Sequence, residues 1–244
     1  MIRTAHSIRP APGSASTSGL ARHWLAAFNV IGGAWTLTPW LVPALMAVGA
    51  TGLARVGYLF YGLQCHQLAE RSYFLFGDQL MYSITQIAAV TGSSDPLSLR
   101  DFVGNASMGY KVAWSDRMVS LYTSLWLAGV AYAISRRRIR PLPIFWLAVL
   151  LLPLAVDGGT HLISDLSGIG QGFRDSNNWL RALSGNSWPE WVYSGDGLGS
   201  FNWMMRLFSG VLAGLGAGLA VVPRLDEAFG FAGRDLESPA PRNG

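Results

Sequence analysis

The sequence contains little charge. Only 13% of the 244 residues are Asp, Glu, Lys or Arg, half are hydrophobic, and the mean hydropathy is +0.29. Because soluble globular domains carry about 25% charged residues, this composition excludes an ordinary soluble domain, a disordered chain and a coiled coil. It predicts an integral membrane protein whose main partner is the lipid bilayer.

Cysteine and lysine are almost absent. Cys65 is the single cysteine, so neither a disulfide within the chain nor an all-thiolate metal site can form. Lys111 is the single lysine, and the net charge of +4 therefore comes almost entirely from arginine. The one dense basic run, residues 136–140, lies between two apolar stretches. A nucleic-acid-binding face needs basic residues spread along one surface, so we predict a membrane-topology signal and no nucleic-acid partner.

The common catalytic motifs are also absent. The chain has no P-loop, dinucleotide fingerprint, G-x-S-x-G elbow, H-E-x-x-H or C-x-x-C sequence. The usual ATPase, hydrolase and oxidoreductase classes are therefore not indicated. Whether the protein is an enzyme, and which cofactor it would use, stay unknown at this point.

Four uncharged stretches predict an all-α integral membrane fold with four transmembrane helices. The first exceeds the ~20 residues needed to cross a bilayer, and it is too long for the apolar core of a cleavable signal peptide. Two shorter apolar patches, Val56–Leu63 and Leu80–Val90, predict interfacial or re-entrant helices on the outer side, although a further spanning segment within residues 50–92 stays open. The four predicted spans are Trp24–Ala54, Met118–Ile134, Pro141–Val156 and Leu207–Val222.

These spans predict the domain organisation and the orientation. Residues 1–21 are predicted to be a disordered tail, residues 22–223 a single membrane domain, and residues 224–244 a second tail. Cytoplasmic loops carry an excess of arginine and lysine, so the loop at residues 136–140 is predicted to be cytoplasmic. Four spans then place both tails in the cytoplasm and the protein in the cell membrane.

The lengths of the last three spans predict a polar site. At ~1.5 Å per residue each run is shorter than the ~30 Å hydrocarbon core, so each helix must extend beyond it. On the outer side the extensions add charged residues, and the segment at residues 65–77 returns to the same leaflet. Charges at membrane depth usually face a partner or a cavity. The candidate polar site therefore comprises Cys65, His66, Glu70, Arg71, Asp116, Arg117, Asp157, His161, Asp165 and Arg206.

Three of these residues are spaced for one helical stripe. Asp157, His161 and Asp165 follow each other at intervals of four. A carboxylate and an imidazole one turn apart can hold a divalent metal or relay a proton. In the alternative interpretation, Asp157 pairs with Arg117 or Arg206 and only holds the helices together.

The segment around the single cysteine has two interpretations. His66 and Glu70 on one helical face would complement Asp157 and His161 in a mixed nitrogen and oxygen metal site. A thiol beside a histidine and near Arg71 could also be reactive. The alternative is a buried Cys65 next to a hydrogen-bonded His66.

The last span carries a face of small residues, Gly210, Gly214 and Gly218. Such faces let helix backbones approach closely and associate by van der Waals contact. The partner helix can belong to the same chain or to another subunit of a homo- or hetero-oligomer. Before this span, the polar segment Gly158–Ser200 is longer than ordinary loops, which indicates a functional or a disordered region.

Four motifs, taken in order, resemble domain of unknown function family 2085, which comprises predicted multi-pass membrane proteins of bacteria and archaea. They are CHQLAERSYFLFG (65–77), GYKVAWSDR (109–117), LPLAVDGGTH (152–161) and an N-W-x-x-R-x-x-S-G entry into the last span (202–210). The resemblance covers roughly residues 24–223 and attaches no reaction. Many members carry a second cysteine where this chain has Ser115, which argues against a two-cysteine site. The resemblance implies membrane residence and a shared outer-face set of Cys65, His66, Glu70, Arg71, Arg117, Asp157 and Arg206.

Three functional hypotheses follow. In the first, the outer polar site binds a small ligand, an ion or a lipid headgroup. In the second, the protein is an accessory subunit that packs through the glycine face. In the third, it is a small transporter that uses Asp157; this ranks last because the sequence shows no internal inverted repeat, which transporters often have.

Overall fold

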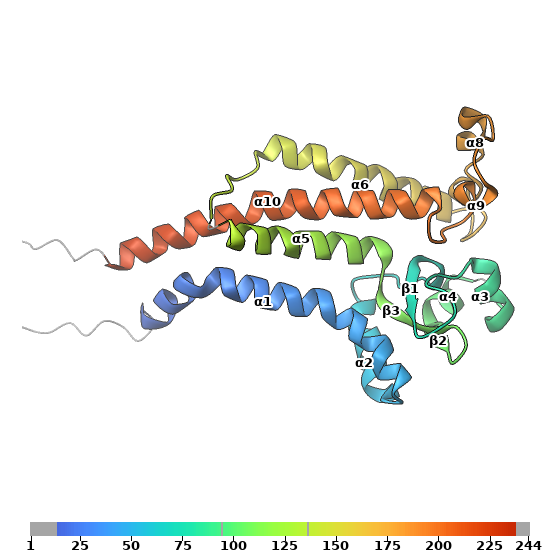
Figure 1. Ribbon diagram of the computed structural model, residues 1–244, viewed down its shortest axis with the longest axis horizontal. Helices are drawn as coiled ribbons and strands as arrows, with labels where there is room; N and C mark the ends of the chain where they lie inside the picture. The colour runs from blue at the N-terminus through green and yellow to red at the C-terminus, as the bar shows by residue number, and fades with distance from the viewer. Residues whose placement is uncertain (1–13, 94, 136, 238–244) are drawn as a thin grey trace, which may run out of the picture.

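The computed structural model describes residues 14–93, 95–135 and 137–237. Four long helices lie side by side, and a small sheet and several short helices gather at one end of them (Figure 1). The beginning of the first long helix and the end of the last one lie together at the opposite end. The long helices are α1 (Ser14–Ala47), α5 (Asp116–Ile134), α6 (Ile144–Asp165) and α10 (Phe201–Glu237).

Three of the long helices are long and apolar enough to cross a membrane. They are His23–Ala47 within α1, Ile144–Asp165 (α6) and Phe201–Phe229 within α10. Helix α5 lies where the second span was predicted, and its buried Ser120 and Ser124 face α10. The structure therefore supports three candidate spans. A fourth span and the orientation of the termini stay predictions.

The predicted first span is not one helix. Helix α1 ends at Ala47, and Gly49 adopts the left-handed conformation, with φ at +81°. The amides of Gly49 and Ala50 donate to the carbonyls of Met46 and Leu45, which satisfies the end of the helix as a glycine cap does. A second helix, α2 (Thr51–Gly62), then leads away from the bundle (Figure 1). The patch predicted at Val56–Leu63 lies largely in α2, and the patch at Leu80–Val90 overlaps the short helix α3 (Ile84–Thr91).

The first long helix begins within the stretch that was predicted as the first tail. Helix α1 begins at Ser14, so residues 14–21 belong to it, and their alanine and leucine residues favour a helix. Residues 1–13 lie outside the described part. At the other end, α10 continues past Val222 because Leu225 and Phe229 pack near Trp24, whose indole donates to Asp226 at 3.0 Å.

The end of the bundle contains a three-stranded antiparallel sheet, so the fold is not all-α as predicted. Its strands are β1 (Ser72–Leu75), β2 (Gly104–Asn105) and β3 (Gly109–Ser115), in the order β1-β3-β2. Aromatic and β-branched residues favour strands, and β1 and β3 are rich in them. The remaining short elements are η1 (Ala69–Arg71), α4 (Pro96–Asp101), α7 (Phe173–Ser176), α8 (Asn178–Ser184) and α9 (Glu190–Tyr193).

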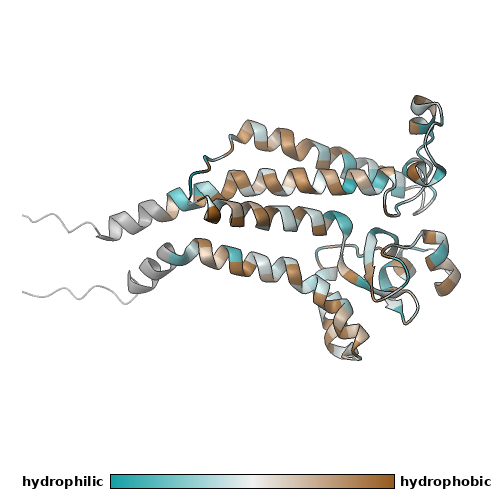
Figure 2. Ribbon diagram, in the orientation of Figure 1, coloured by the Kyte–Doolittle hydropathy of each residue, from teal (hydrophilic) through white to brown (hydrophobic). Residues whose placement is uncertain are grey.

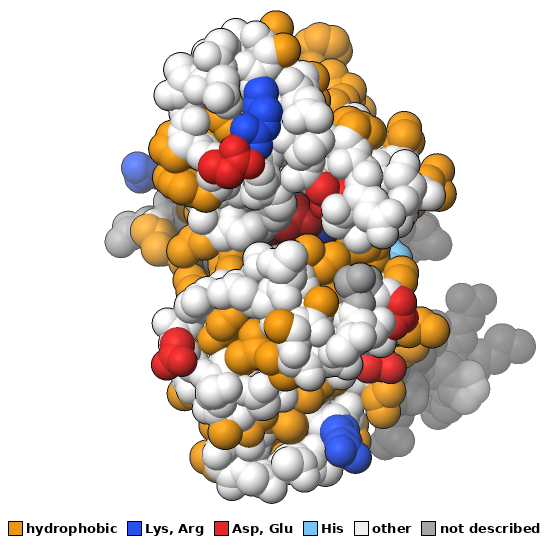
Figure 3. All heavy atoms as spheres, turned by 90° about the vertical axis from the view of Figure 1, so that its right-hand side faces the viewer, with side chains coloured by type: hydrophobic (Ala, Val, Ile, Leu, Met, Phe, Trp, Pro, Cys, Tyr) orange, Lys and Arg blue, Asp and Glu red, His pale blue; other side chains and the backbone are white. Residues whose placement is uncertain are grey.

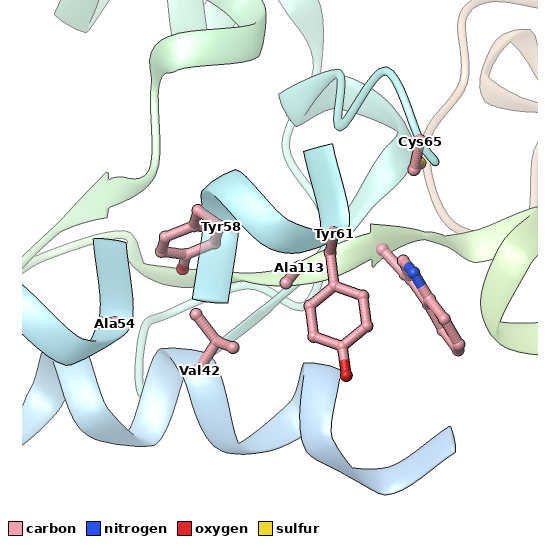
Figure 4. Packing of buried hydrophobic residues seen from close by; sticks show 7 residues of the cluster. Val42, Ala54, Tyr58, Tyr61, Cys65 and Ala113 are labelled. Atoms are coloured by element: carbon pink, nitrogen blue, oxygen red, sulfur yellow. The ribbon is translucent and has the colours of Figure 1, made fainter. Parts of the chain in front are cut away.

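An apolar cluster attaches α2 to α1 and to the sheet. Val42 of α1, Tyr58 and Tyr61 of α2 and Ala113 of β3 pack around one another, with Cys65 at the edge of the cluster (Figure 4). The Tyr58 hydroxyl donates to the carbonyl of Lys111 at 2.6 Å, so the buried phenol is satisfied. The chain that follows α2 is therefore held beside the ends of α5 and α6.

The glycine face of α10 packs on α5 of the same chain. A Cβ atom at Gly210 would collide with the Ser120 hydroxyl, and one at Gly218 with the Cβ of Ala128. At Gly214 it would meet the backbone of α5 itself. The partner helix thus lies within the chain, and because α5 covers this face, nothing here supports an oligomer formed through it.

Candidate functional site

Four arginines and four aspartates form a network of two ion-paired groups where the long helices meet the sheet, and His161 lies between the groups, 3.4 Å from Asp157 and 3.6 Å from Asp196. The helices are apolar along much of their length, whereas hydrophilic residues lie at this end (Figure 2). A buried charge is tolerated only when it is paired and hydrogen-bonded, and each of these eight groups has a partner of opposite sign. The members are Arg71, Arg117, Arg174 and Arg206 with Asp116, Asp157, Asp165 and Asp196.

Arg206 of α10 lies at the centre of the network and is almost completely buried. Its Nε donates to both carboxylate oxygens of Asp116 at 2.9 Å, which joins α10 to the start of α5. Its Nη1 and Nη2 donate to the carboxylate and the backbone carbonyl of Asp196, at 2.5 and 2.8 Å. One guanidinium therefore connects two helices with the segment that precedes α10.

Arg71 of η1 makes the second connection. Its two terminal nitrogens donate to the two oxygens of Asp165, each at 2.8 Å, in a bidentate pair. Its Nε donates to Asp196 at 2.8 Å. Burial would raise the pKa of Asp196, but Arg206 and Arg71 hold it well below its usual value. Asp196 is therefore a permanent anion between two permanent cations.

Asp157 of α6 is paired with two arginines. It accepts from Arg117 at 2.7 Å and from Arg174 at 2.8 Å. Helix α6 continues through Gly158 and Gly159, so Asp157, His161 and Asp165 do share one stripe. The His161 Nδ1 lies 3.1 Å from the Asp157 carbonyl oxygen. The alternative of a pairing aspartate therefore describes Asp157, with Arg174 as its second partner in place of Arg206.

The structure does not assemble the predicted metal site. Among the residues that it describes, no three His, Cys, Asp or Glu side chains are grouped to hold a metal ion. Residues 63–68 form no helix and Glu70 lies in the 3-10 turn η1, so His66 and Glu70 share no helical face. His66 is exposed, whereas Glu70 is buried. The expected common face of His66 and Glu70 is therefore wrong, and arginines hold the carboxylates of α6.

A pocket of about 530 Å³ opens beside this network. Residues 64–68 and α4 form one wall, and the start of α5 and the end of α6 form the other. The Sγ of Cys65 lies on this wall, where it accepts long hydrogen bonds from the amides of Gln67 and Ser115, at 3.5 and 3.4 Å. Of the ten predicted site residues, seven line the pocket: Cys65, His66, Arg71, Arg117, His161, Asp165 and Arg206.

The remaining predicted residues lie behind or beside the pocket. Asp116 and Asp157 are behind it, paired with arginines, and Glu70 faces a second, smaller cavity. Among the described residues neither Glu70 oxygen accepts a hydrogen bond, and burial raises the pKa of Glu70 to about 7. Glu70 therefore lies apart from the metal arrangement that the sequence suggested.

Three buried charged residues near the site, Lys111, Arg174 and Asp196, were not among the predicted site residues. Arg174 and Asp196 belong to the polar segment Gly158–Ser200, in which no periodicity marks one residue over another. Lys111 is fully buried in β3, where its Nζ donates to the carbonyls of Gln67 and Arg100, and burial lowers its pKa to about 7. Its being the single lysine, within an otherwise apolar strand, was the one signal available.

The comparisons with known proteins agree with the membrane assignment. The family model described as "Predicted membrane protein (DUF2085)" matches residues 106–188, which contain the second and third of the four motifs. An uncharacterised protein of Methanocaldococcus jannaschii is 28% identical over 130 residues, which make up 52% of this chain and 58% of the relative. No solved structure matches the chain. The predicted resemblance to this family of predicted membrane proteins is therefore confirmed over residues 106–188.

Proposed function

We propose that this protein binds an amphipathic ligand with an anionic headgroup in the 530 Å³ pocket. The pocket has the size of a small-molecule site, for which 300–1,000 Å³ is typical. It combines two kinds of lining, apolar side chains and arginines. The single observation that carries the proposal is the presence of arginine donors without a full set of partners on a mainly apolar wall.

The charge of the lining favours an anion. Arg71 and Arg206 are neutralised by aspartates, but the Nε of Arg117 is buried and has no hydrogen-bond partner among the described residues. Arg100 donates one hydrogen bond to the carbonyl of Gly62 and has no carboxylate partner in the described part of the chain. Asp165, already held by Arg71, is the one acidic residue on the wall. A phosphate or carboxylate would therefore meet donors and excess positive charge.

The apolar part of the lining favours a hydrocarbon chain on the same ligand. Leu162 of α6, Leu166 just after α6 and Leu97 of α4 border the pocket and are largely exposed. Because α6 is one of the three candidate spans, an acyl chain in the bilayer can lie along these side chains while the headgroup reaches Arg117. An amphipathic ligand bound here would have its headgroup at the polar end of the bundle and its hydrocarbon chain beside the apolar helices.

The test uses three twelve-carbon amphiphiles that differ only in their heads. The protein is placed in phosphatidylcholine nanodiscs and titrated with dodecyl phosphate, dodecyl maltoside or dodecyltrimethylammonium. Cys65, the single thiol, lies in the pocket and reports occupancy through its rate of alkylation by a maleimide. We expect dodecyl phosphate to slow alkylation at saturable concentrations, and the other two amphiphiles to have little effect.

Two arginine variants separate the site from general electrostatics. Arg117→Gln should remove the effect of dodecyl phosphate, because it removes the donor with a free Nε. Arg55→Gln changes an exposed arginine of α2 outside the pocket and should leave the effect intact. Equal protection by all three amphiphiles, or equal behaviour of the two variants, would contradict the proposal.

A further inference from the structure

A second cavity of about 210 Å³ lies on the other side of Arg71. Ile169 borders both cavities, and the paired Arg71, Asp165 and Asp196 lie between them. In the view onto this end of the molecule, acidic side chains are visible in a hollow between the two halves of the face (Figure 3). The cavity is therefore distinct from the pocket of the proposed function, and its chemistry is of opposite sign.

Glu70 is the feature of this cavity that lacks an explanation. It is 3% exposed, it borders the cavity, and neither carboxylate oxygen accepts a hydrogen bond from the described residues. The nearest cation, the Nε of Arg71, lies 3.8 Å from Oε1 and already donates to Asp196 at 2.8 Å. A buried carboxylate that accepts no hydrogen bond costs free energy. Glu70 would therefore be stabilised by a ligand that donates hydrogen bonds to it.

The other charged groups near Glu70 do not supply that donor. Lys111 and Arg206 act on Glu70 only at a distance, because their nitrogens are hydrogen-bonded to other partners. Asp175 and Asp196 border the same cavity and add negative potential. Asp196 is neutralised by two arginines, whereas Asp175 accepts only the backbone amide of Gly172 at 2.8 Å. The cavity thus carries two acidic side chains, Glu70 and Asp175, whose one ion pair among the described residues is the 3.8 Å contact of Glu70 with Arg71, and no described arginine or lysine lines the cavity.

We infer that this cavity binds a small primary ammonium group, with Glu70 as its main acceptor. An ammonium offers three N–H donors, which suit the two free oxygens of Glu70 and the hydroxyl oxygens of Ser83 and Ser194 on the cavity wall. The ring of Trp191 also borders the cavity, and aromatic faces attract organic cations. No group of three metal-ligating side chains exists among the described residues, so the arrangement suits an organic cation better than a metal ion.

The size of the cavity limits the ligand. At about 30 Å³ per water molecule, 210 Å³ corresponds to about seven waters, enough for methylammonium or ethanolamine. The burial that raises the pKa of Glu70 to about 7 also raises that of Asp175 above its usual value. An incoming cation would favour the ionised form of both groups, so binding and deprotonation are coupled.

The experiment compares two ammonium ions. The full protein in phosphatidylcholine nanodiscs, which contain no primary amine, is titrated calorimetrically with methylammonium or tetramethylammonium chloride at constant ionic strength. We expect saturable binding of methylammonium at pH 8 and at least tenfold weaker binding of tetramethylammonium, which has no N–H donor. Between pH 8 and pH 6 the affinity for methylammonium should fall by about tenfold, because ionisation of a group with a pKa of about 7 is required.

Three variants make the result specific. Glu70→Gln keeps the shape and should abolish methylammonium binding, while Asp78→Asn, an exposed acid outside the cavity, should not. Trp191→Leu, at an exposed position that tolerates change, should weaken binding by about two- to fivefold. Glu70→Gln should retain the response of Cys65 alkylation to dodecyl phosphate, so failure of this inference is distinguishable from failure of the proposed function and from misfolding.

Two results would overturn the inference. One is methylammonium binding that is the same in the wild type and in Glu70→Gln. The other is Glu70-dependent binding of calcium or magnesium with no response to methylammonium. A separate experiment identifies the source of the amine. If phosphatidylethanolamine in the nanodisc competes with methylammonium, the natural ligand is a lipid headgroup. If phosphatidylethanolamine does not compete but free ethanolamine still binds, the ligand is a soluble amine.

Discussion

Replacing Arg206 with methionine tests whether the ion network holds the bundle together. Arg206 supplies the side-chain donors seen on the fully buried carboxylate of Asp116, and it also binds Asp196. Methionine preserves much of the apolar stem but leaves Asp116 without its cation. Removing one partner of a buried ion pair costs about 3–5 kcal/mol, because the other charge stays buried. Asp196 retains Arg71 and should contribute less to the loss.

The assay is thermal unfolding of the purified protein in detergent, followed by tryptophan fluorescence. At roughly 2–4 °C per kcal/mol, Arg206→Met should lower Tm by roughly 6–20 °C. Arg181 serves as the control because it also pairs with a carboxylate, but with that of the exposed Glu190. Arg181→Met should leave Tm close to that of the wild type.

A double variant decides whether the orphaned carboxylate is the cause. Adding Asp116→Asn to Arg206→Met removes the unpaired charge and should restore at least about 1 kcal/mol, a coupling typical of contacting residues. If the two substitutions are simply additive, or if Arg206→Met and Arg181→Met unfold at the same temperature, the reasoning about buried pairing is refuted.

Two further predictions concern packing and pH. Gly214→Ala places a methyl group against the backbone of Leu121 and should cost about 1–3 kcal/mol of stability in the same unfolding assay. Gly52→Ala, whose methyl group meets open space beside α2, should be neutral or slightly stabilising. Equal effects of the two variants would argue against a tight contact between α5 and α10. Burial raises the pKa of Glu70 to about 7, so ionising Glu70 destabilises the folded protein. This destabilisation is absent below about pH 4.5, grows as the pH rises, and is complete above about pH 7. Without added amine, Glu70→Gln should therefore gain about 2–3 kcal/mol over the wild type between pH 5 and pH 8, and a constant difference would contradict this.

The parts of the fold that follow from chain length and hydropathy could be predicted. The apolar runs indicated where α5, α6 and α10 lie. Because each run is too short to cross the bilayer, each helix had to extend into charged residues, which implied that Asp116, Asp157 and Arg206 lie at the same end. These inferences hold because a helix has a fixed rise and because unpaired charges are excluded from apolar surroundings.

Other parts depend on the tertiary path of the chain and left no local signal. Gly49 ends α1 inside an apolar run that looks continuous in the sequence, because only its left-handed backbone distinguishes it from the other glycines of that run. The short strands were hidden because aromatic residues are equally typical of a membrane interface. Arg174 and Asp196 enter the network through the fold of α7 and the turn before α10, which spacing alone does not specify.

The order of the network along the chain has a consequence for biosynthesis. Asp116 emerges from the ribosome 90 residues before Arg206, its partner, and Arg71 precedes Asp165 by 94 and Asp196 by 125 residues. Helices α5 and α6 are thus made while part of their charge is still uncompensated. A nascent chain that stops before α10 lacks only Arg206 of the four arginines, so Asp116 has no cation until α10 is made, whereas Asp165 and Asp196 already have Arg71.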